Sequence, residues 1–185
     1  MPSTISFTST KGVNTVNYIV KKLIPTWKDG LCLIQRECIP KILNLEDVFA
    51  IDATGGGKSA LFSVPILIHR KISQNPSAYP VFNVSICPKP VGVVVTPTKG
   101  LESNIVKQLK KDFNIDAFAY TSDNLSAKCI ASVDIIKEIT SCQYQIICVD
   151  PEHLREQEWF LIANSTTFGQ NLIFACAKEG HVVNK

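Results

Sequence analysis

The chain has 185 residues, of which 45% are hydrophobic and 19% are charged, and its formal net charge is +3. This composition is ordinary for a folded protein with one main hydrophobic core, and it argues against a globally disordered chain. The net charge is too small to indicate a nucleic-acid-binding protein by itself, because such proteins are recognised from clustered Lys and Arg.

Elements can be predicted along the chain from hydrophobic periodicity. The stretch "VNTVNYIVKKLI" predicts a helix over 13–24, in an N-terminal extension of residues 1–30 that precedes a main domain of residues 31–185. Further along, segments rich in β-branched residues alternate with amphipathic ones, which is typical of strands and helices wound into a parallel sheet. The predicted strands are 47–52, 91–96, 115–120, 145–150 and 171–177. The predicted helices lie near 31–44, 58–70, 101–112, 124–139 and 151–163.

A proline-rich stretch, residues 71–90, predicts a long surface loop between a helix and the second strand. The short Val- and Ile-rich strands are those of a sheet that helices cover on both faces. We therefore expect an α/β fold in three layers, with a mostly parallel central sheet.

The seven cysteines are scattered, odd in number and never spaced C-x-x-C, so neither a disulfide framework nor a zinc site is indicated. We expect all seven to be small buried hydrophobes of a protein in a reducing intracellular compartment. The sequence shows no signal-peptide pattern and no run near the ~20 apolar residues of a membrane helix. We expect a nuclear or cytoplasmic protein without a membrane partner. No feature of the sequence indicates an oligomeric state.

A glycine-rich turn, "DATGGGKS" over 52–59, follows a predicted strand and precedes a helix predicted to begin at Lys58. In this arrangement backbone N–H groups at a helix N-terminus converge on phosphate oxygens. The glycines let the backbone approach phosphate, Lys58 can reach the β- and γ-phosphates, and the Ser59 hydroxyl can bind Mg²⁺. The predicted nucleotide site comprises Thr54, Gly55, Gly56, Gly57, Lys58 and Ser59. Because Asp52 replaces the first glycine of the usual pattern, the alternative is a glycine-rich loop that merely precedes Lys and Ser.

Four stretches occur in a family-like order: "LIQRECIPKIL", "ATGGGKS", "VVVTPTKGLESNIVKQL" and "YQIICVDPEHL". Together they resemble the first RecA-like domain of superfamily 2 helicases of the DEAD/DEAH type, and most closely the RecQ-like ATP-dependent DNA helicases. The resemblance runs from about residue 31 to the last residue. It implies a RecA-like P-loop NTPase fold, ATP and Mg²⁺ as cofactors, 3′→5′ unwinding of DNA, and Gln35 as the residue that reads adenine.

The same resemblance implies that the loops after two of the strands contact the backbone of single-stranded DNA. Thr98 and Lys99 are the predicted contacts, and Thr96 could also donate to phosphate. On the next predicted helix, the lysines are expected to form an ordinary solvated face; these are Lys107, Lys110 and Lys111. We expect His153 to lie at the surface without a role.

The acidic motif departs from the family pattern. Where the family has Asp-Glu-Ala-His, this chain reads Lys178, Glu179, Gly180 and His181. The resemblance gives Glu179 the role of orienting or deprotonating the attacking water. Lys178 puts a positive charge where a dication would bind. The Coulomb repulsion weakens the binding of Mg²⁺ by about 1 kcal/mol or more at contact distance. The sequence ends at Lys185, before the second RecA-like domain that would supply a catalytic arginine.

We therefore expect this chain alone to bind ATP with little or no hydrolysis or unwinding. The main alternative is a non-enzymatic helicase relic that binds nucleic acid or a partner without nucleotide control. A small-molecule kinase that uses the same phosphate loop is less favoured, because no lid segment is apparent and the Thr-Pro and Pro-Glu motifs would be unexplained.

Overall fold

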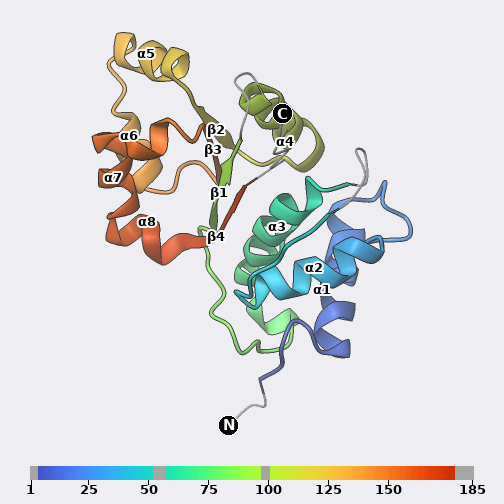
Figure 1. The fold of residues 1–185 in the computed structure, drawn as a ribbon. Coiled ribbons are helices and arrows are strands. Elements are labelled where there is room, and N and C mark those ends of the chain that lie inside the picture. Colours follow the sequence, from blue (N-terminus) through green and yellow to red (C-terminus); the bar gives the residue numbers. More distant parts are fainter. Residues whose placement is uncertain (1–3, 52–56, 97–100, 178–185) are drawn as a thin grey trace. The chain divides into compact units, whose positions relative to one another are not determined.

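A computed structural model of the protein describes residues 4–51, 57–96 and 101–177 (Figure 1). The chain divides into two compact units, residues 1–90 and residues 91–185. Within the described ranges, every helix is too short or too polar to cross a membrane. The boundary expected after residue 30 remains a prediction.

The first unit contains three helices that contact one another: α1 (Thr10–Leu23), α2 (Leu33–Leu43) and α3 (Ala60–Gln74). Helix α1 confirms the predicted N-terminal helix, and it begins where the Ser9 side chain accepts a hydrogen bond from the backbone N–H of Gly12. A short 3₁₀ turn, η1 (Pro76–Ala78), follows α3. The rest of the predicted loop holds the N-terminal segment, because the Phe7 and Phe82 rings stack with centroids 3.8 Å apart.

His69 is a buried polar group in α3, with 1% of its surface exposed. Its Nδ1 accepts a hydrogen bond from the backbone N–H of Cys87 at 3.0 Å. Its Nε2 finds no hydrogen-bond partner among the described residues. Burial lowers the pKa of His69 to about 4, because a charged imidazolium would lose its hydration there. His69 is therefore neutral in the folded protein near pH 7.

The second unit contains a sheet of four parallel strands in the order β2-β3-β1-β4. The strands are β1 (Val91–Val95), β2 (Ala117–Tyr120), β3 (Ile146–Val149) and β4 (Leu172–Ala177). Residues of β3 are buried on both faces, as its continuous apolar run predicts. The α/β fold with a parallel sheet is thus confirmed, and four of the five predicted strands form it.

Helices cover both faces of this sheet (Figure 1). On one face, strand residues such as Val93 and Ile147 share a core with Trp159 and Phe168, which belong to α7 (Gln157–Ala163) and α8 (Thr166–Asn171). Helix α4 (Leu101–Phe113) contacts β2 and β3 through the other face. The remaining helices are α5 (Ser122–Ile130), α6 (Ile135–Thr140) and the 3₁₀ turn η2 (His153–Arg155). The three predicted layers are present within this unit.

The strand predicted over 47–52 is wrong for its described part. Residues 47–51 have no regular secondary structure, and Phe49 and Ile51 are 91% and 82% exposed. Val48 and Ala50 are half-buried, so exposed and half-buried side chains alternate as they would in a strand. Among the described residues, however, no strand pairs with this segment. A strand forms only where a neighbouring strand completes its backbone hydrogen bonds. The hydrophobic pattern of a sequence describes the side chains and does not indicate whether such a neighbour is present.

Two predicted helices are interrupted. The helix expected over 124–139 is divided between α5 and α6, because Ser132 adopts a left-handed φ of 56° and Asp134 caps a new helix by accepting from the N–H of Lys137. The helix expected over 151–163 begins only at Gln157, after η2, and α8 was not predicted. Helix α3 extends beyond its expected end to Gln74.

The cysteines are more varied than the sequence suggested. Cys38, Cys87 and Cys148 are buried, which agrees with the prediction. Cys32 and Cys129 are exposed, which contradicts it. Cys32 caps the start of α2, and Cys129 lies on α5, a helix that buries none of its residues. Cys32 lies between two leucines and Ile130 follows Cys129, so the sequence did not indicate that these positions are exposed.

Gly92 gives the first test of the packing in the sheet. A Cβ atom at Gly92 would lie 2.1 Å from the tip of the Phe174 ring on β4, so Gly92→Ala is expected to destabilise the protein by about 1–2 kcal/mol. The ring is half-buried and has some freedom to move, which limits the loss. Urea unfolding of Gly92→Ala, Phe174→Ala and the double variant measures the coupling. Strictly additive losses would show that the two positions do not compete for space.

Candidate functional site

The described end of the glycine-rich turn is built around Gly57. Its φ is +78°, in the left-handed region that favours glycine. A Cβ atom there would lie 2.6 Å from Nε2 of Gln35. The carbonyl oxygen of Gly57 accepts from Gln35 Nε2 at 3.2 Å and from the backbone N–H of Ala60 at 2.9 Å. Gly57 therefore directs the chain into α3 and lies against α2 without a side chain of its own.

Gln35 fastens the first turn of α2 to this glycine. Its side chain is nearly fully buried, with 5% of the residue exposed. Its Oε1 accepts from the backbone N–H of Cys32 at 3.1 Å, while its Nε2 donates to Gly57. Both ends of the amide are thus engaged within the first unit. Contact with a base through this amide requires the exchange of one of these two bonds.

The predicted nucleotide-site residues are only partly described. Gln35, Gly57, Lys58 and Ser59 come together where α2 contacts α3, and Lys58 and Ser59 form the half-buried turn that leads into the helix at Ala60. The predicted helix start at Lys58 is therefore early by two residues. The other predicted site residues lie outside the described residues; these are Thr54, Gly55, Gly56, Thr98, Lys99, Lys178 and Glu179.

A buried carboxyl pair lies at the carboxyl end of the sheet in the second unit. Glu102, in the first turn of α4, is 0% exposed, and Asp150, directly after β3, is 5% exposed. The Glu102 carboxyl acts directly on that of Asp150, and a hydrogen bond between them is possible only while one of the two holds a proton. Burial and the neighbouring Glu102 carboxyl raise the pKa of Asp150 to about 6. Asp150 thus titrates much closer to neutrality than an exposed aspartate.

Thr96 belongs to the same group. It is fully buried, and its hydroxyl donates a hydrogen bond to Oε1 of Glu102. Because its only hydroxyl proton is directed to Glu102, donation from Thr96 to phosphate requires the exchange of this bond and stays a prediction. Sequence reasoning missed the Glu102–Asp150 pair; the available signal was an acidic residue directly after the fully apolar strand "IICV".

The turn after β3 is fixed by aromatic contacts. His153 is 8% exposed, and its Nδ1 lies 2.7 Å from Oε1 of Glu156. The His153 and Tyr120 rings pack edge to face, with their centroids 5.5 Å apart. Burial, with Glu156 and Glu158 nearby, raises the pKa of Tyr120 to about 12. The expectation of a surface histidine is thus wrong, because η2 returns the chain toward the sheet. These residues hold the turn in place and provide no activated nucleophile.

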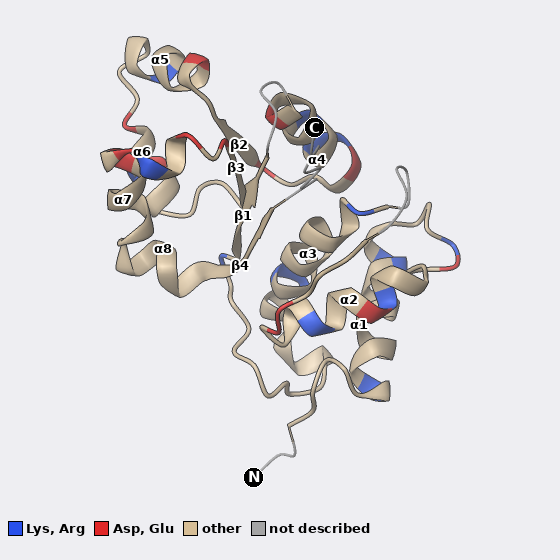
Figure 2. Ribbon diagram, in the orientation of Figure 1, with Lys and Arg blue, Asp and Glu red and all other residues tan. Residues whose placement is uncertain are grey.

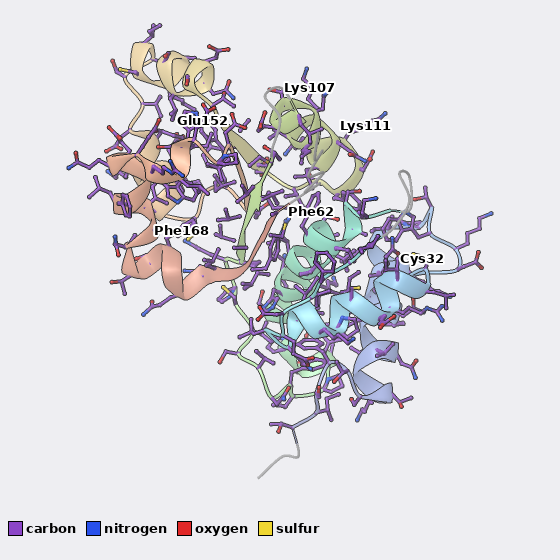
Figure 3. All side chains as sticks on the ribbon, viewed as in Figure 1. Cys32, Phe62, Lys107, Lys111, Glu152 and Phe168 are labelled. Atoms are coloured by element: carbon purple, nitrogen blue, oxygen red, sulfur yellow. The ribbon has the colours of Figure 1, made fainter. Side chains whose placement is uncertain are left out.

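Lysines on α4 match the expected solvated face. Lys107 and Lys111 are exposed and extend outward from the helix (Figure 3). Lys110 is exposed as well, and its Nζ lies 2.7 Å from Oδ1 of Asp116. Exposed ion pairs of this kind contribute little to stability.

The sequence pattern of the DEAD/DEAH box helicase family matches residues 32–171. Among curated proteins, DEAD-box ATP-dependent RNA helicase 36 of Arabidopsis thaliana is 40% identical over 77 residues, which cover 42% of this chain and 13% of that protein. ATP-dependent RNA helicase dbp8 of Emericella nidulans is 34% identical over 102 residues, which cover 55% of this chain and 17% of that protein. This chain therefore spans less than a fifth of either relative.

Among solved structures, the DUF1998 helicase MrfA, bound to DNA and AMPPNP, superposes with a TM-score of 0.62 at 17% sequence identity. The match covers 97% of this chain and 22% of that chain. At this level of identity the likeness supports the fold alone.

Proposed function

Because the chain belongs to the DEAD/DEAH box helicase family, we propose that it binds ATP at its glycine-rich turn and a nucleic-acid strand at the loops that follow β1 and β3. The observation that carries the proposal is Gly57: a left-handed glycine, closely approached by Gln35, that leads directly into α3. A turn of this kind brings backbone N–H groups to a helix N-terminus, where phosphate binds.

The residues present fit a nucleotide with Mg²⁺. A Cβ atom at Gly57 would lie 2.6 Å from Nε2 of Gln35, so only glycine lets the turn lie this close to the side chain that the resemblance names as the adenine reader. Lys58 would bind the β- and γ-phosphates, and the Ser59 hydroxyl would hold the metal. When bound, Mg²⁺ neutralises charge on the phosphate oxygens. Thr98 and Lys99 would contact the nucleic-acid backbone.

Hydrolysis is proposed to be feeble. Glu179 can still orient water, but Lys178 stands where the family places the aspartate that serves the metal. Binding of ATP should therefore exceed its turnover. The relatives named above are RNA helicases, whereas the similar structure is a helicase bound to DNA. The expected RecQ-like kinship, DNA substrate and 3′→5′ polarity accordingly remain predictions.

The nucleotide site is tested with Lys58→Ala. Loss of a charge-assisted contact of about 1.5–3 kcal/mol is expected to weaken binding of a fluorescent ATP analogue by about 10- to 150-fold. Lys71→Ala, near the other end of α3, is the matched control and should bind like the unmodified chain. Titrations with and without Mg²⁺ show how much the metal contributes to the affinity for the nucleotide. Equal affinity of the Lys58→Ala protein and the unmodified chain would refute the site.

The alternative, a non-enzymatic nucleic-acid-binding relic, predicts a different response. Single-stranded RNA and DNA of one sequence would bind with the same affinity whether ATP, ADP or no nucleotide is present. In the proposed function, nucleotide changes that affinity. Titration of both strands under the three conditions separates the two functions.

A further inference from the structure

The modest net charge conceals an uneven distribution. Residues 1–90 contain ten Lys and Arg and five Asp and Glu, a net charge of +5. Residues 91–185 contain nine Lys and Arg and eleven Asp and Glu, a net charge of −2. The first unit is therefore the basic part of the chain, and it has the charge that attracts a polyanion.

Helix α1 contributes three lysines to this charge, Lys11, Lys21 and Lys22 (Figure 2). It contains no acidic residue, and Lys11, Tyr18 and Lys22 are all exposed, with Tyr18 at 59%. Their spacing of seven and then four residues puts them on one side of the helix. Residues of another side are buried in the unit; these are Gly12, Val16, Ile19 and Val20. The exposed face is about 16 Å long from Lys11 to Lys22.

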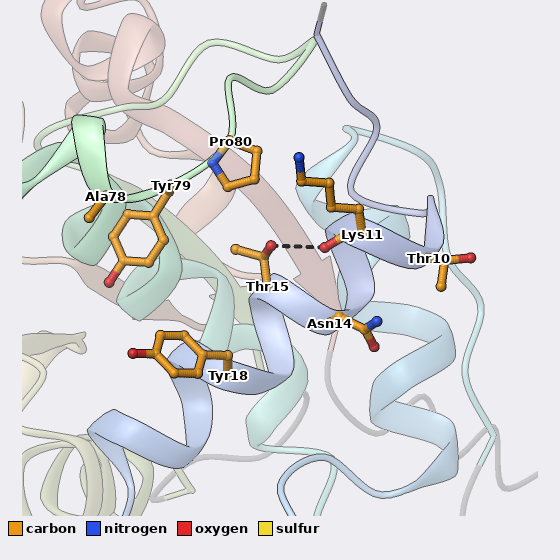
Figure 4. Close-up of a pocket in the computed structure, with 8 residues that line it drawn as sticks. All are labelled: Thr10, Lys11, Asn14, Thr15, Tyr18, Ala78, Tyr79 and Pro80. Atoms are coloured by element: carbon orange, nitrogen blue, oxygen red, sulfur yellow. Dashed lines mark hydrogen bonds between the residues drawn. The ribbon is translucent and has the colours of Figure 1, made fainter.

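A groove of about 530 Å³ runs beside this face (Figure 4). Lys11, Asn14 and Tyr18 line it from α1, and Tyr79 and Pro80 line it from the segment after η1. Two tyrosine rings from segments far apart in sequence thus lie at one groove with a lysine. Aromatic rings stack on unpaired bases, and ammonium groups contact phosphates.

We propose that this face, defined by Lys11, Tyr18, Lys22 and Tyr79, binds single-stranded nucleic acid. None of its residues belongs to the loops after β1 and β3, and the proposal goes beyond the function proposed above because it requires no nucleotide. The charge decides between occupants: a proline-rich peptide would also use the tyrosines, but it would gain nothing from the two lysines. A base-paired duplex would leave the tyrosines without unstacked bases to contact.

The test uses the full chain without nucleotide. Single-stranded RNA and DNA of identical sequence, longer than the ~4–16 nucleotides that such surfaces occupy, are titrated over a range of salt concentrations. Lys11→Gln with Lys22→Gln is expected to reduce the slope of log K against log salt by about 1.4, since each phosphate contact contributes about 0.7 for single strands. Tyr18→Ala and Tyr79→Ala are each expected to weaken binding by about 5- to 150-fold, while Tyr18→Phe retains it.

Matched controls keep the result specific. Lys28→Gln with Lys89→Gln removes the same charge from exposed positions outside the face, and it should leave the slope close to that of the unmodified chain. Equal effects of the two double variants would overturn the proposal and indicate diffuse attraction. Unchanged strand affinity in the tyrosine variants would also overturn it. The same holds if a proline-rich peptide binds this face and neither the RNA nor the DNA strand displaces it. Lys58→Ala should bind strands normally here, so failure of the nucleotide site and failure of this face are distinguishable.

Discussion

Lowering the pH from 7 to 4 is expected to destabilise the first unit by about 3 kcal/mol through His69. The folded protein keeps the pKa of this buried imidazole at about 4, below its ordinary value of 6.5. In the unfolded chain His69 binds a proton below pH 6.5, whereas in the folded protein it stays neutral until about pH 4. Stability is therefore lost progressively as the pH falls from 6.5 to 4, and the loss is complete below that range.

Hydrogen exchange of peptides from α3, measured across this range, reports the effect where His69 lies. His69→Asn is the informative variant, because its amide oxygen can still accept from the N–H of Cys87 while it no longer titrates. It should be less stable than the unmodified chain at pH 7, owing to the space it leaves, but it should lack the decline between pH 6.5 and 4. An undiminished decline in this variant would assign the acid sensitivity to other groups.

Buried strands were the most predictable part of the fold. "VGVVV" and "IICV" are apolar at every position, and only a sheet covered on both faces buries both sides of such a strand. "DVFAI" carries the same signal, yet Phe49 and Ile51 are exposed. The difference lies in backbone pairing, which depends on other parts of the chain and leaves no mark in the local sequence.

The candidate site was predictable where local geometry requires a particular residue. The left-handed turn at Gly57 needs glycine, so the sequence displays it. Glu102 and His69 were not predictable as buried groups, because the same residues are usual on surfaces and their burial depends on which elements meet in the fold. For Asp150, the one signal was its place directly after the apolar strand "IICV". A charge pattern was readable for α1, but only the structure shows that Tyr18 and Tyr79 line one groove.

Replacing Asp150 by Asn is expected to stabilise the protein by about 2 kcal/mol at pH 8, allowing for screening by water at the edge of the sheet. Burial and Glu102 raise the pKa of Asp150 to about 6, from an ordinary value of 3.8. The native pair is thus most stable below pH 3.8, where it holds its proton, and it loses that stability as the pH rises through 6. At pH 8 two negative charges face each other in a buried place. An Asn amide instead donates a neutral N–H to the Glu102 carboxylate.

The sign of this effect is opposite to that of His69. Between pH 4 and 6.5, acid weakens the first unit and strengthens the second, so a single unfolding curve for the whole chain would partly hide both effects. Exchange of peptides from β3 and α4, compared at pH 5 and pH 8, isolates the carboxyl pair. Asp150→Asn should increase protection at pH 8 and change it little at pH 5. Asp112→Asn, which neutralises an exposed carboxylate on α4, is the control and should do neither.

Glu102→Gln completes the test from the other side of the pair. Its amide oxygen can still accept from Thr96, and its N–H₂ can donate to Asp150, so it should give a similar gain at pH 8. Because either change alone removes the repulsion between the two carboxylates, the double variant should gain little beyond either single one. Additive gains would mean that the carboxyls do not interact, and equal losses at both pH values would mean that their hydrogen bond outweighs their repulsion.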